Sequence, residues 1–386
     1  MKNNRTFLEK LLDGAEVEWK PLDEVANIVN NARKPVKSSL RVSGNIPYYG
    51  ANNIQDYVEG YTHDGEFVLI AEDGSASLEN YSIQWAVGKF WANNHVHVVN
   101  GKEKLNNRFL YHYLTNMNFI PFLAGKDRAK LTKAKLQQIP IPIPPLSVQT
   151  EIVKILDTLT ALTSELTSEL ILRRKQYEYY REKLLSEEEL IKLGATAENL
   201  SDVTSISSGG TPSTKEPAYW VGGNIPWIKS ESCKNKLIDE IKHHITEMGL
   251  QNSNAKLLSP NTTLMAMVGA TIFKTAFLPF EATTNQNIAA IKSKNELGIK
   301  DKFIFYYLTN MYDFFISKLS GYNMVNLSQI KNIKILLPPL KEQQHIVSIL
   351  DKFEALTNSI SEGLPLAIEQ SQKRYEYYRE LLLNFS

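Results

Sequence analysis

Two long stretches of the chain place apolar residues at alternating steps of three and four, the spacing of a helix with one buried seam. The first stretch follows Pro144-Pro145-Leu146 and the second follows Pro338-Pro339-Leu340, and the two are similar in sequence. Each spans about 40 residues, which predicts a helix roughly 60 Å long. Because an apolar seam must be buried, we expect the two helices to pack antiparallel on each other. The seam positions are Ile155, Leu159, Leu162, Leu166, Leu170, Arg173, Tyr177, Tyr180 and Leu184, then Ile349, Phe353, Leu356, Ile360, Leu364, Ile368, Ser371, Tyr375, Tyr378 and Leu382.

The spacing is interrupted once in the first stretch and again in the second. An additional step of four falls in the tandem Thr-Ser-Glu-Leu repeat of residues 163–170, and such an insertion is a stutter in a heptad pattern. The second stretch has one further step of four, so the two copies differ in length by four residues. It also contains Pro365 shortly after Gly363, which predicts a kinked or broken helix there.

The repeat extends beyond the helices. Leu114-Thr115-Asn116-Met117 recurs as Leu308-Thr309-Asn310-Met311, and Glu9-Lys10-Leu11-Leu12 at the start of the chain recurs at the end of the first helix. We predict an α+β fold in which two tandem α/β domains are separated by two long helices in an antiparallel coiled coil, with pseudo-twofold, circular organisation. Strands are predicted at 66–71, 95–99, 263–268 and 287–291, and helices at 105–124 and 301–319. The four segments of the repeat are residues 1–143, 144–190, 191–337 and 338–386.

Composition excludes several classes of protein. The chain has 386 residues, a net charge of +1 and 43% hydrophobic residues, which is ordinary for a globular protein. Cys233 is the only cysteine, so a disulfide framework and a cysteine-based zinc site are excluded, and a reducing cytoplasm is expected. No apolar run reaches the ~18 residues of a membrane span, and the first residues do not resemble a signal peptide.

The repeated motif PPL-x-(E/V)-Q-x-x-IV-x-IL-D at the start of each long helix resembles the conserved regions of type I restriction-modification specificity subunits. That family also shows GGTPS, YW and G-x-IPW at the start of a target recognition domain, and here these are Gly209–Ser213, Tyr219-Trp220 and Gly223–Trp227. Residues 45–58 and 88–99 look like an alternative version of the same motifs. The tandem Thr-Ser-Glu-Leu repeat is similar to that of the type IC subgroup.

The resemblance implies that residues 1–143 and 191–337 are target recognition domains, each of which binds one half of a split, asymmetric site in double-stranded DNA. It implies that the helices set the distance between the half-sites and bind two modification (methyltransferase) subunits. Restriction (motor-nuclease) subunits would complete the complex. The family implies no catalytic centre and no bound cofactor in this chain, with S-adenosylmethionine, ATP and Mg²⁺ on the partner subunits.

The residues agree with a non-catalytic role. The sequence contains neither an Asn-Pro-Pro-aromatic methyltransferase motif nor a phosphate-binding GxxxxGK[ST] loop. His95 and His97 alternate as a metal pair could, but they lack a third ligand nearby, so a structural role is favoured. The alternatives are a coiled-coil adaptor with two protein-binding domains and no DNA, and, more remotely, a self-contained restriction enzyme.

A basic loop precedes the first long helix and is the main candidate for DNA contact, because lysine and arginine bind phosphates. The matching loop of the second domain is neutral and rich in amides, as two different half-sites would require. The alternative is a solvated helix face. The candidates are Lys126, Arg128, Lys130, Lys133 and Lys135 in the first loop, and Tyr322, Asn323 and Asn326 in the second.

Further candidates lie in the opening segment of each domain and in a turn that precedes a strand. Asparagine and glutamine bind adenine through two hydrogen bonds, but they also build turns, and for each residue alone the structural role is favoured. Trp220 and Trp227 are expected to be core residues. The further candidates are Tyr48, Tyr49, Asn52, Asn53, Asn93 and Asn94, then Ser213, Lys215, Trp227, Lys229, Ser230, Asn285, Gln286 and Asn287.

The Tyr-Glu-Tyr-Tyr-Arg-Glu segment occurs in both helical stretches. Tyr179 and Tyr377 fall off the predicted seam, so each is a candidate for contact with a partner subunit, or with the other copy of the segment. The tandem repeat suggests a second hypothesis, that its four residues set the spacer of the DNA site, because four helical residues over-rotate by about 40°, close to one base pair of DNA.

Overall fold

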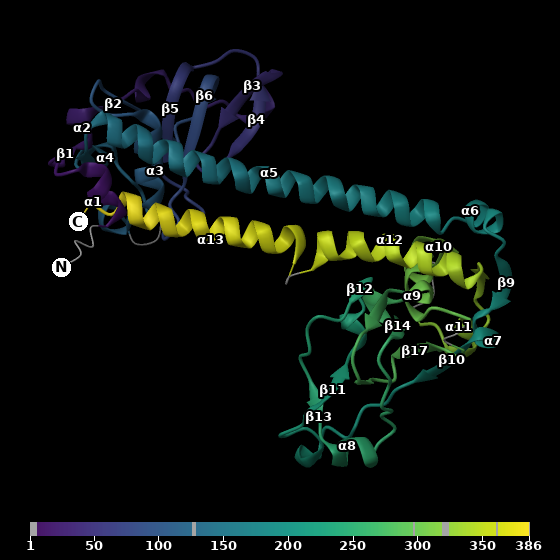
Figure 1. Cartoon of the computed structure of the whole chain (residues 1–386). Helices are drawn as coiled ribbons and strands as arrows, with labels where there is room; N and C mark the ends of the chain where they lie inside the picture. The colour runs from purple at the N-terminus through teal and green to yellow at the C-terminus, as the bar shows by residue number, and fades with distance from the viewer. Residues whose placement is uncertain (1–5, 126–128, 296–297, 319–323, 360–361, 386) are drawn as a thin grey trace. The chain divides into compact units, whose positions relative to one another are not determined.

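The computed structural model describes residues 6–125, 129–295, 298–318, 324–359 and 362–385. The chain divides into two compact units, each containing one α/β domain and part of both helical stretches (Figure 1). Unit 1 is residues 1–167 with 367–386, and unit 2 is residues 168–366. The division therefore falls inside the long helices.

Unit 1 is built on a six-stranded sheet with strand order β2-β7-β5-β6-β3-β4. Neighbouring strands are antiparallel except β3 and β6, which are parallel. Apolar side chains of the sheet and of the helix that follows it, among them Val68, Val99 and Phe109, form the core. A separate ribbon of β1 and β8 precedes the long helix. The strands are β1 (Glu18–Pro21), β2 (Ala26–Ile28), β3 (Ser43–Tyr49), β4 (Ile54–Val58), β5 (His63–Ala71), β6 (Ile83–Ala92), β7 (Val96–Gly101) and β8 (Pro140–Ile143).

Unit 2 repeats this plan. Its main sheet has the order β10-β17-β14-β15-β12, a smaller sheet has the order β13-β11-β16, and β18 pairs with β9 in a ribbon equivalent to that of unit 1. All four predicted strands are confirmed, in β5, β7, β14 and β17. The strands are β9 (Thr196–Asn199), β10 (Thr204–Ser208), β11 (Ile225–Ile228), β12 (Lys236–Leu237), β13 (His244–Ile245), β14 (Thr262–Ala266), β15 (Thr275–Leu278), β16 (Thr283–Thr284), β17 (Ile288–Ser293) and β18 (Lys334–Leu337).

The two helices predicted inside the domains are shorter than expected. The helix predicted at 105–124 is α3 (Asn107–Asn116), which ends where Met117 takes an extended conformation, and Pro121 lies in a separate 3-10 turn. The helix predicted at 301–319 is divided at Met311 into α9 (Asp301–Asn310) and α10 (Tyr312–Lys318). The remaining short helices are α1 (Phe7–Leu12), α2 (Leu22–Val25), α4 (Lys133–Gln137), α6 (Glu187–Lys192), α7 (Leu200–Val203), α8 (Glu247–Gln251) and α11 (Leu327–Lys331).

The first helical stretch is the uninterrupted helix α5 (Leu146–Leu184), and the second is α12 (Leu340–Asn358) followed by α13 (Gly363–Leu383). The predicted break is confirmed. Gly363 has a φ of +76°, and a Cβ at this position would lie 2.5 Å from the carbonyl oxygen of Ala355, so only glycine fits this turn without strain. Pro365 is tolerated because it lies in the first turn of α13.

Paired helices occur within each unit. In unit 1 the hydroxyls of Thr163 on α5 and Ser371 on α13 are 2.9 Å apart. In unit 2 the ring of Phe353 on α12 packs against Tyr177 and Tyr180 of α5, and Arg174 donates to the carbonyl oxygen of Thr357. Residue numbers thus rise along α5 as they fall along α12, which confirms the antiparallel packing.

Leu382 on the predicted seam is completely buried, but several equally buried residues of the long helices lie off that seam. Ile152 and Leu156 of α5, and Ile346 and Leu350 of α12, are completely buried, because each helix also packs on the α/β domain of its own unit. The heptad spacing identified the face between the helices and missed this second face. Across the described ranges, no helix has both the length and the apolar character needed to cross a membrane.

Glu354 of α12 is a buried carboxyl group in the helix pair of unit 2, only 8% exposed. Burial raises its pKa, and hydrogen bonds from Asn358 and Tyr177 offset this only in part. The folded state therefore holds a proton more tightly than the unfolded state, and stability is lost as the pH rises above the ordinary value of 4.5. We expect Glu354→Gln to raise the thermal unfolding midpoint at pH 7–8, and the gain to disappear below pH 4.5. Equal gains at both pH values would contradict this, and Glu362→Gln, an exposed residue, is the control.

Candidate nucleic-acid interface

An asparagine turn occupies the same place in both units. In unit 1 the side-chain oxygen of Asn93 accepts from the N–H of His95 at 2.8 Å, and in unit 2 Asn285 accepts from Asn287 at 3.2 Å. The N–H of Asn93 donates to the last residue of β3, and the N–H of Asn285 donates to the last residue of β11. Each of these strands runs parallel to the strand that precedes the turn, which is β6 in unit 1 and β16 in unit 2. Asn93 and Asn285 are therefore buried parts of the turn, whereas the next residues, Asn94 and Gln286, are exposed.

The two candidate loops lie beside these turns at equivalent places. In unit 1 the N–H of Leu131 donates to Glu72, which follows β5, and in unit 2 Val325 donates to Met267, which follows β14. The predicted equivalence of the loops is confirmed by these matching bonds. Lys126, Arg128, Tyr322 and Asn323 lie outside the described residues. Of the other candidates in these loops, Lys133 and Lys135 are exposed on α4.

Asn326 has a structural bond in the described part of the loop. Its side chain accepts from the N–H of Gln329 and caps α11, and Thr132 caps α4 in the same way in unit 1. Both helices need such a cap because their first N–H groups have no partner within the helix. Asn326 nevertheless remains exposed.

Glu72 is the acidic partner of two basic side chains beside the asparagine turn of unit 1. Its carboxylate accepts from Arg33 at 2.7 Å and lies 2.9 Å from the ammonium of Lys130. Burial raises the pKa of Glu72, but the bonds from Arg33 and Lys130 outweigh burial and hold this pKa below its usual value. Arg33 also donates to the carbonyl oxygens of Asn94 and Val96. Lys130 is thus a partner of Glu72 as well as a half-exposed cation.

Arg33 was not among the residues predicted from the sequence. The sequence did contain a signal for a basic site here, because the stretch from Val25 to Gln55 has four lysine or arginine residues and no aspartate or glutamate. In unit 2 apolar residues occupy the corresponding positions: Met267 stands where Glu72 does, and Val268 forms a backbone bridge with Met324. The same place in the repeat is therefore charged in one unit and apolar in the other.

The opening segments mainly build the fold around the turn. Tyr48 is 2% exposed and its hydroxyl accepts from the N–H of Val36. The side-chain amide of Asn52 donates to the carbonyl oxygen of Gly74 and accepts from the N–H of Ala76, and so joins two loops. Tyr49, at the end of β3, packs its ring against Phe90.

In the equivalent strand of unit 2, Trp227 is the residue before the last; it is 5% exposed, packs against Trp220 and donates to the carbonyl oxygen of Gly210. Trp227 is therefore a core residue, as expected, whereas Trp220 is half-buried and packs against that core. Lys229 lies 4.0 Å from Glu231, whereas Ser213 and Lys215 are exposed.

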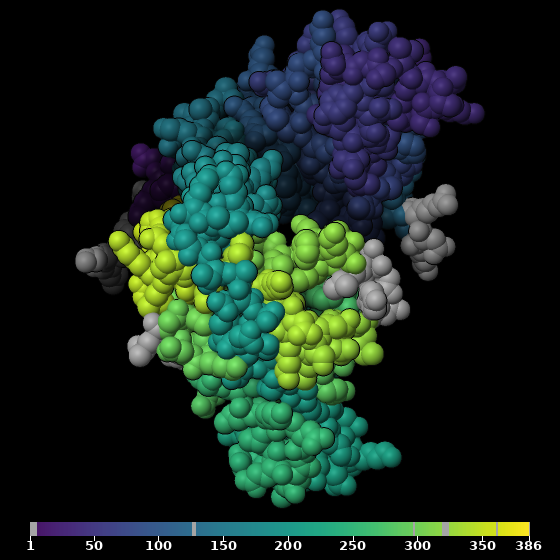
Figure 2. Space-filling view, turned by 90° about the vertical axis from the view of Figure 1, so that its right-hand side faces the viewer, coloured from purple at the N-terminus to yellow at the C-terminus, as the bar shows by residue number. Residues whose placement is uncertain are grey.

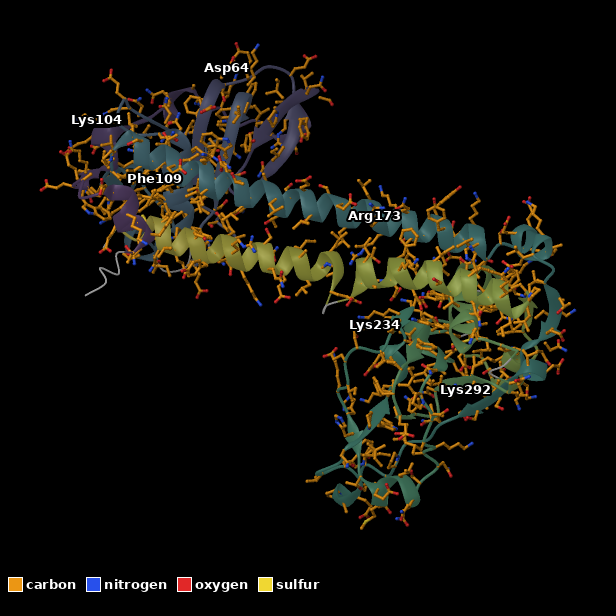
Figure 3. All side chains as sticks on the ribbon, in the orientation of Figure 1. Asp64, Lys104, Phe109, Arg173, Lys234 and Lys292 are labelled. Atoms are coloured by element: carbon orange, nitrogen blue, oxygen red, sulfur yellow. The ribbon has the colours of Figure 1, made fainter. Side chains whose placement is uncertain are left out.

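Each long helix is held to its domain by the same two side chains. Gln149 is completely buried, donates to the carbonyl oxygens of Lys104 and Pro144 and accepts from the N–H of Asn106. Gln343 makes the equivalent three bonds, to Gly298, Pro338 and Lys300. This contact lies at the start of α5 in unit 1, near Lys104 and Phe109, which are labelled in Figure 3.

An aspartate two turns further along each helix makes a second contact. Asp157 accepts from Arg108 and His112, and Asp351 accepts from Lys302 and Tyr306. The glutamine and the aspartate are the two polar residues of the repeated motif, so their function in this fold is to fix the helix on its domain. Tyr179 and Tyr377, by contrast, are 57% and 61% exposed and are not among the residues that make these contacts.

The two histidines that alternate in sequence have separate partners. His97 is completely buried between Asn30 and the carbonyl oxygen of Leu131, whereas His95 pairs with Asp73 at the surface. Among the residues described, no group of three or more histidine, cysteine, aspartate or glutamate side chains could hold a metal ion.

Comparison with known proteins agrees with the repeated architecture. Residues 15–173 and 196–370 match the family of the type I restriction modification DNA specificity domain. The chain is 64% identical to a putative type I restriction enzyme specificity subunit of Haemophilus influenzae, over all of both proteins. It is 33% identical to the EcoR124I/EcoR124II specificity subunit of Escherichia coli, over 98% of this chain and 97% of that protein.

A solved structure shares the fold. The type I restriction-modification S subunit of M. genitalium aligns with 99% of this chain and 96% of its own, with a TM-score of 0.61 and 14% identity. With a family match to both halves and full-length relatives at 64% and 33% identity, the chain belongs to the family of type I restriction-modification specificity subunits.

Proposed function

We propose that each α/β domain of this chain binds one half of a bipartite, asymmetric DNA site. The observation that carries the proposal is the pair of equivalent loop sets around Asn93 and Asn285, which share their backbone bonds but differ in chemistry. A common scaffold with divergent side chains supports recognition of two unlike sequences, because specificity comes from contacts to base edges. The exposed Asn94 and Gln286 are the proposed base-contacting residues closest to the turns.

The exposure of the other candidate residues separates those that can contact DNA from those that build the fold. Lys133, Lys135, Ser213, Lys215 and Asn326 are available for contact with DNA, whereas the burial of Tyr48, Asn93 and Asn285 supports a structural role for these three. Lys126, Arg128, Tyr322 and Asn323 remain candidates from the sequence. Asn52, whose amide is bonded at both ends, contributes by positioning the loops.

As a member of this family the chain is a non-catalytic subunit. We infer that its long helices bind two methyltransferase subunits, with the exposed rings of Tyr179 and Tyr377 in the two contacts. S-adenosylmethionine, ATP and Mg²⁺ would be bound by the methyltransferase and restriction subunits, and the complex would act in the cytoplasm, where it meets DNA.

Salt-dependent binding of DNA by the reconstituted complex tests this function. We expect the chain with its methyltransferase subunits to shift a DNA fragment that contains the methylated site, with an affinity that falls steeply as salt rises. Native mass spectrometry of the complex should show two methyltransferase subunits per chain. Absent or salt-independent DNA binding, with the complex intact, would favour the adaptor alternative instead.

A further inference from the structure

The opening segment of unit 1 is a cationic part of the molecule that the basic loop does not include. The stretch from Val25 to Gln55 contains Arg33, Lys34, Lys37 and Arg41 and no acidic residue. In unit 2 the equivalent stretch, residues 203–234, has three lysines and also Glu216 and Glu231. The two stretches are equivalent because Lys34 and Gly210 donate their N–H groups to the residue directly before each asparagine turn.

Two of the four cations are bound by the protein itself. Arg33 is paired with Glu72 and with the carbonyl oxygens of the turn. The guanidinium of Arg41 lies 4.2 Å from the ring centre of Tyr48, donates to the carbonyl oxygen of Val36 and is 3.4 Å from Asp56. These contacts fix the path of the segment, so both arginines already have partners within the protein.

Lys34 and Lys37 are different, because both are exposed and neither forms an ion pair with any residue that the structure describes. The backbone of Lys34 is fixed at both its N–H, which donates to Ala92, and its carbonyl oxygen, which accepts from Trp91. The backbone of Lys34 is thus held beside the asparagine turn, and its exposed side chain extends from that fixed point. In Figure 2 the purple surface of this part of the chain faces the viewer.

We propose that Lys34 and Lys37 bind DNA phosphates and position unit 1 on its half-site. This inference rests on the proposed function. A free ammonium beside a base-contacting turn matches the phosphate that flanks the bases, and lysine binds phosphate as a point charge. Because Lys130 of the basic loop is paired with Glu72, the opening segment supplies charge that the described part of that loop does not. The contact carries no base information, so it affects all DNA sequences alike.

The salt dependence of binding measures this contact directly. For the complex with methyltransferase subunits, each phosphate contact contributes about 0.9 to the slope of log affinity against log salt, so Lys34→Gln/Lys37→Gln should lower the slope by about 1.8. The ratio of the DNA affinity of the unchanged protein to that of the double variant should then fall about twelvefold between 50 and 200 mM salt. Affinity for specific and for nonspecific DNA should fall by the same factor, and the methylated sequence should not change.

The controls separate charge from structure. Lys34→Arg keeps the charge and should keep the slope, and Lys104→Gln, an exposed lysine of unit 1 beside the start of α5 (Figure 3), should not change it. An unchanged slope in the double variant overturns this proposal while leaving the function intact. Loss of salt dependence in the unchanged protein would instead contradict the proposed function. If the double variant does not fold, Lys37→Gln alone should still lower the slope by about 0.9.

Discussion

Replacement of Gln343 by alanine should lower the free energy of unfolding by about 3 kcal/mol, since three buried backbone groups lose their partner and each costs about 1 kcal/mol or more. The side chain is 1% exposed, and its amide satisfies the carbonyl oxygens of Gly298 and Pro338 and the N–H of Lys300. No other side chain is placed to satisfy these three groups together in the described part of unit 2. For a unit of this size, the loss corresponds to a thermal midpoint lower by about 6–12 °C.

Gln344→Ala is the matched control, because Gln344 is the next residue on α12 but is exposed, and its loss should change stability by less than about 0.5 kcal/mol. Calorimetry of the purified chain would compare the two variants. Equal midpoints would contradict an anchoring function for Gln343. Gln149→Ala in unit 1 should behave like Gln343→Ala, because its three bonds are the same.

The architecture could be predicted because it is periodic and duplicated. The three-four spacing of apolar residues predicted the long helices, and Gly363 and Pro365 predicted the break in the second copy. The burial of Ile152 and Ile346 could not be predicted from the same pattern, because a heptad describes one face, and these residues pack on a domain whose position depends on the tertiary fold.

The candidate site was predicted less completely. The position of the loops followed from the repeat, but the burial of Asn93 and Asn285 did not, because an asparagine in a turn has the same sequence signal whether its amide bonds the backbone or a base. The pairing of Lys130 with Glu72 joins residues far apart in the chain, and no local pattern indicates it. The four cations between Val25 and Gln55 were visible in the sequence, and only the acid-free context distinguishes them.

Deletion of Thr167–Leu170, one unit of the tandem repeat, should replace the methylated sequence by one with the same two half-sites and a spacer shorter by one base pair. Methylation of the original sequence should fall to background. Four helical residues advance about 6 Å and over-rotate by about 40°, while one base pair of DNA advances about 3.4 Å and rotates about 34–36°. The rotations agree and the advances do not, so a tilted or relaxed helix is part of the hypothesis.

The repeat itself makes this deletion mild for the helix. Arg173 donates to Glu169 one turn earlier, and after the deletion Glu165 would occupy the same place relative to Arg173. The contact of Thr163 with Ser371 in unit 1 and the packing of Tyr177 on Phe353 in unit 2 involve none of the removed residues. Any change in the target should therefore come from the length of α5 and not from its unfolding.

Long-read sequencing of methylated adenines, in cells that carry each variant with the partner subunits, would show the spacer directly. The matched control replaces the same four residues by alanine, which keeps the length of α5 and favours the helix, so the original spacer should remain. A spacer that is unchanged after the deletion would refute the hypothesis that the helix sets it. A changed half-site in either variant would instead place base recognition in α5, since neither variant alters the loops around Asn93 and Asn285.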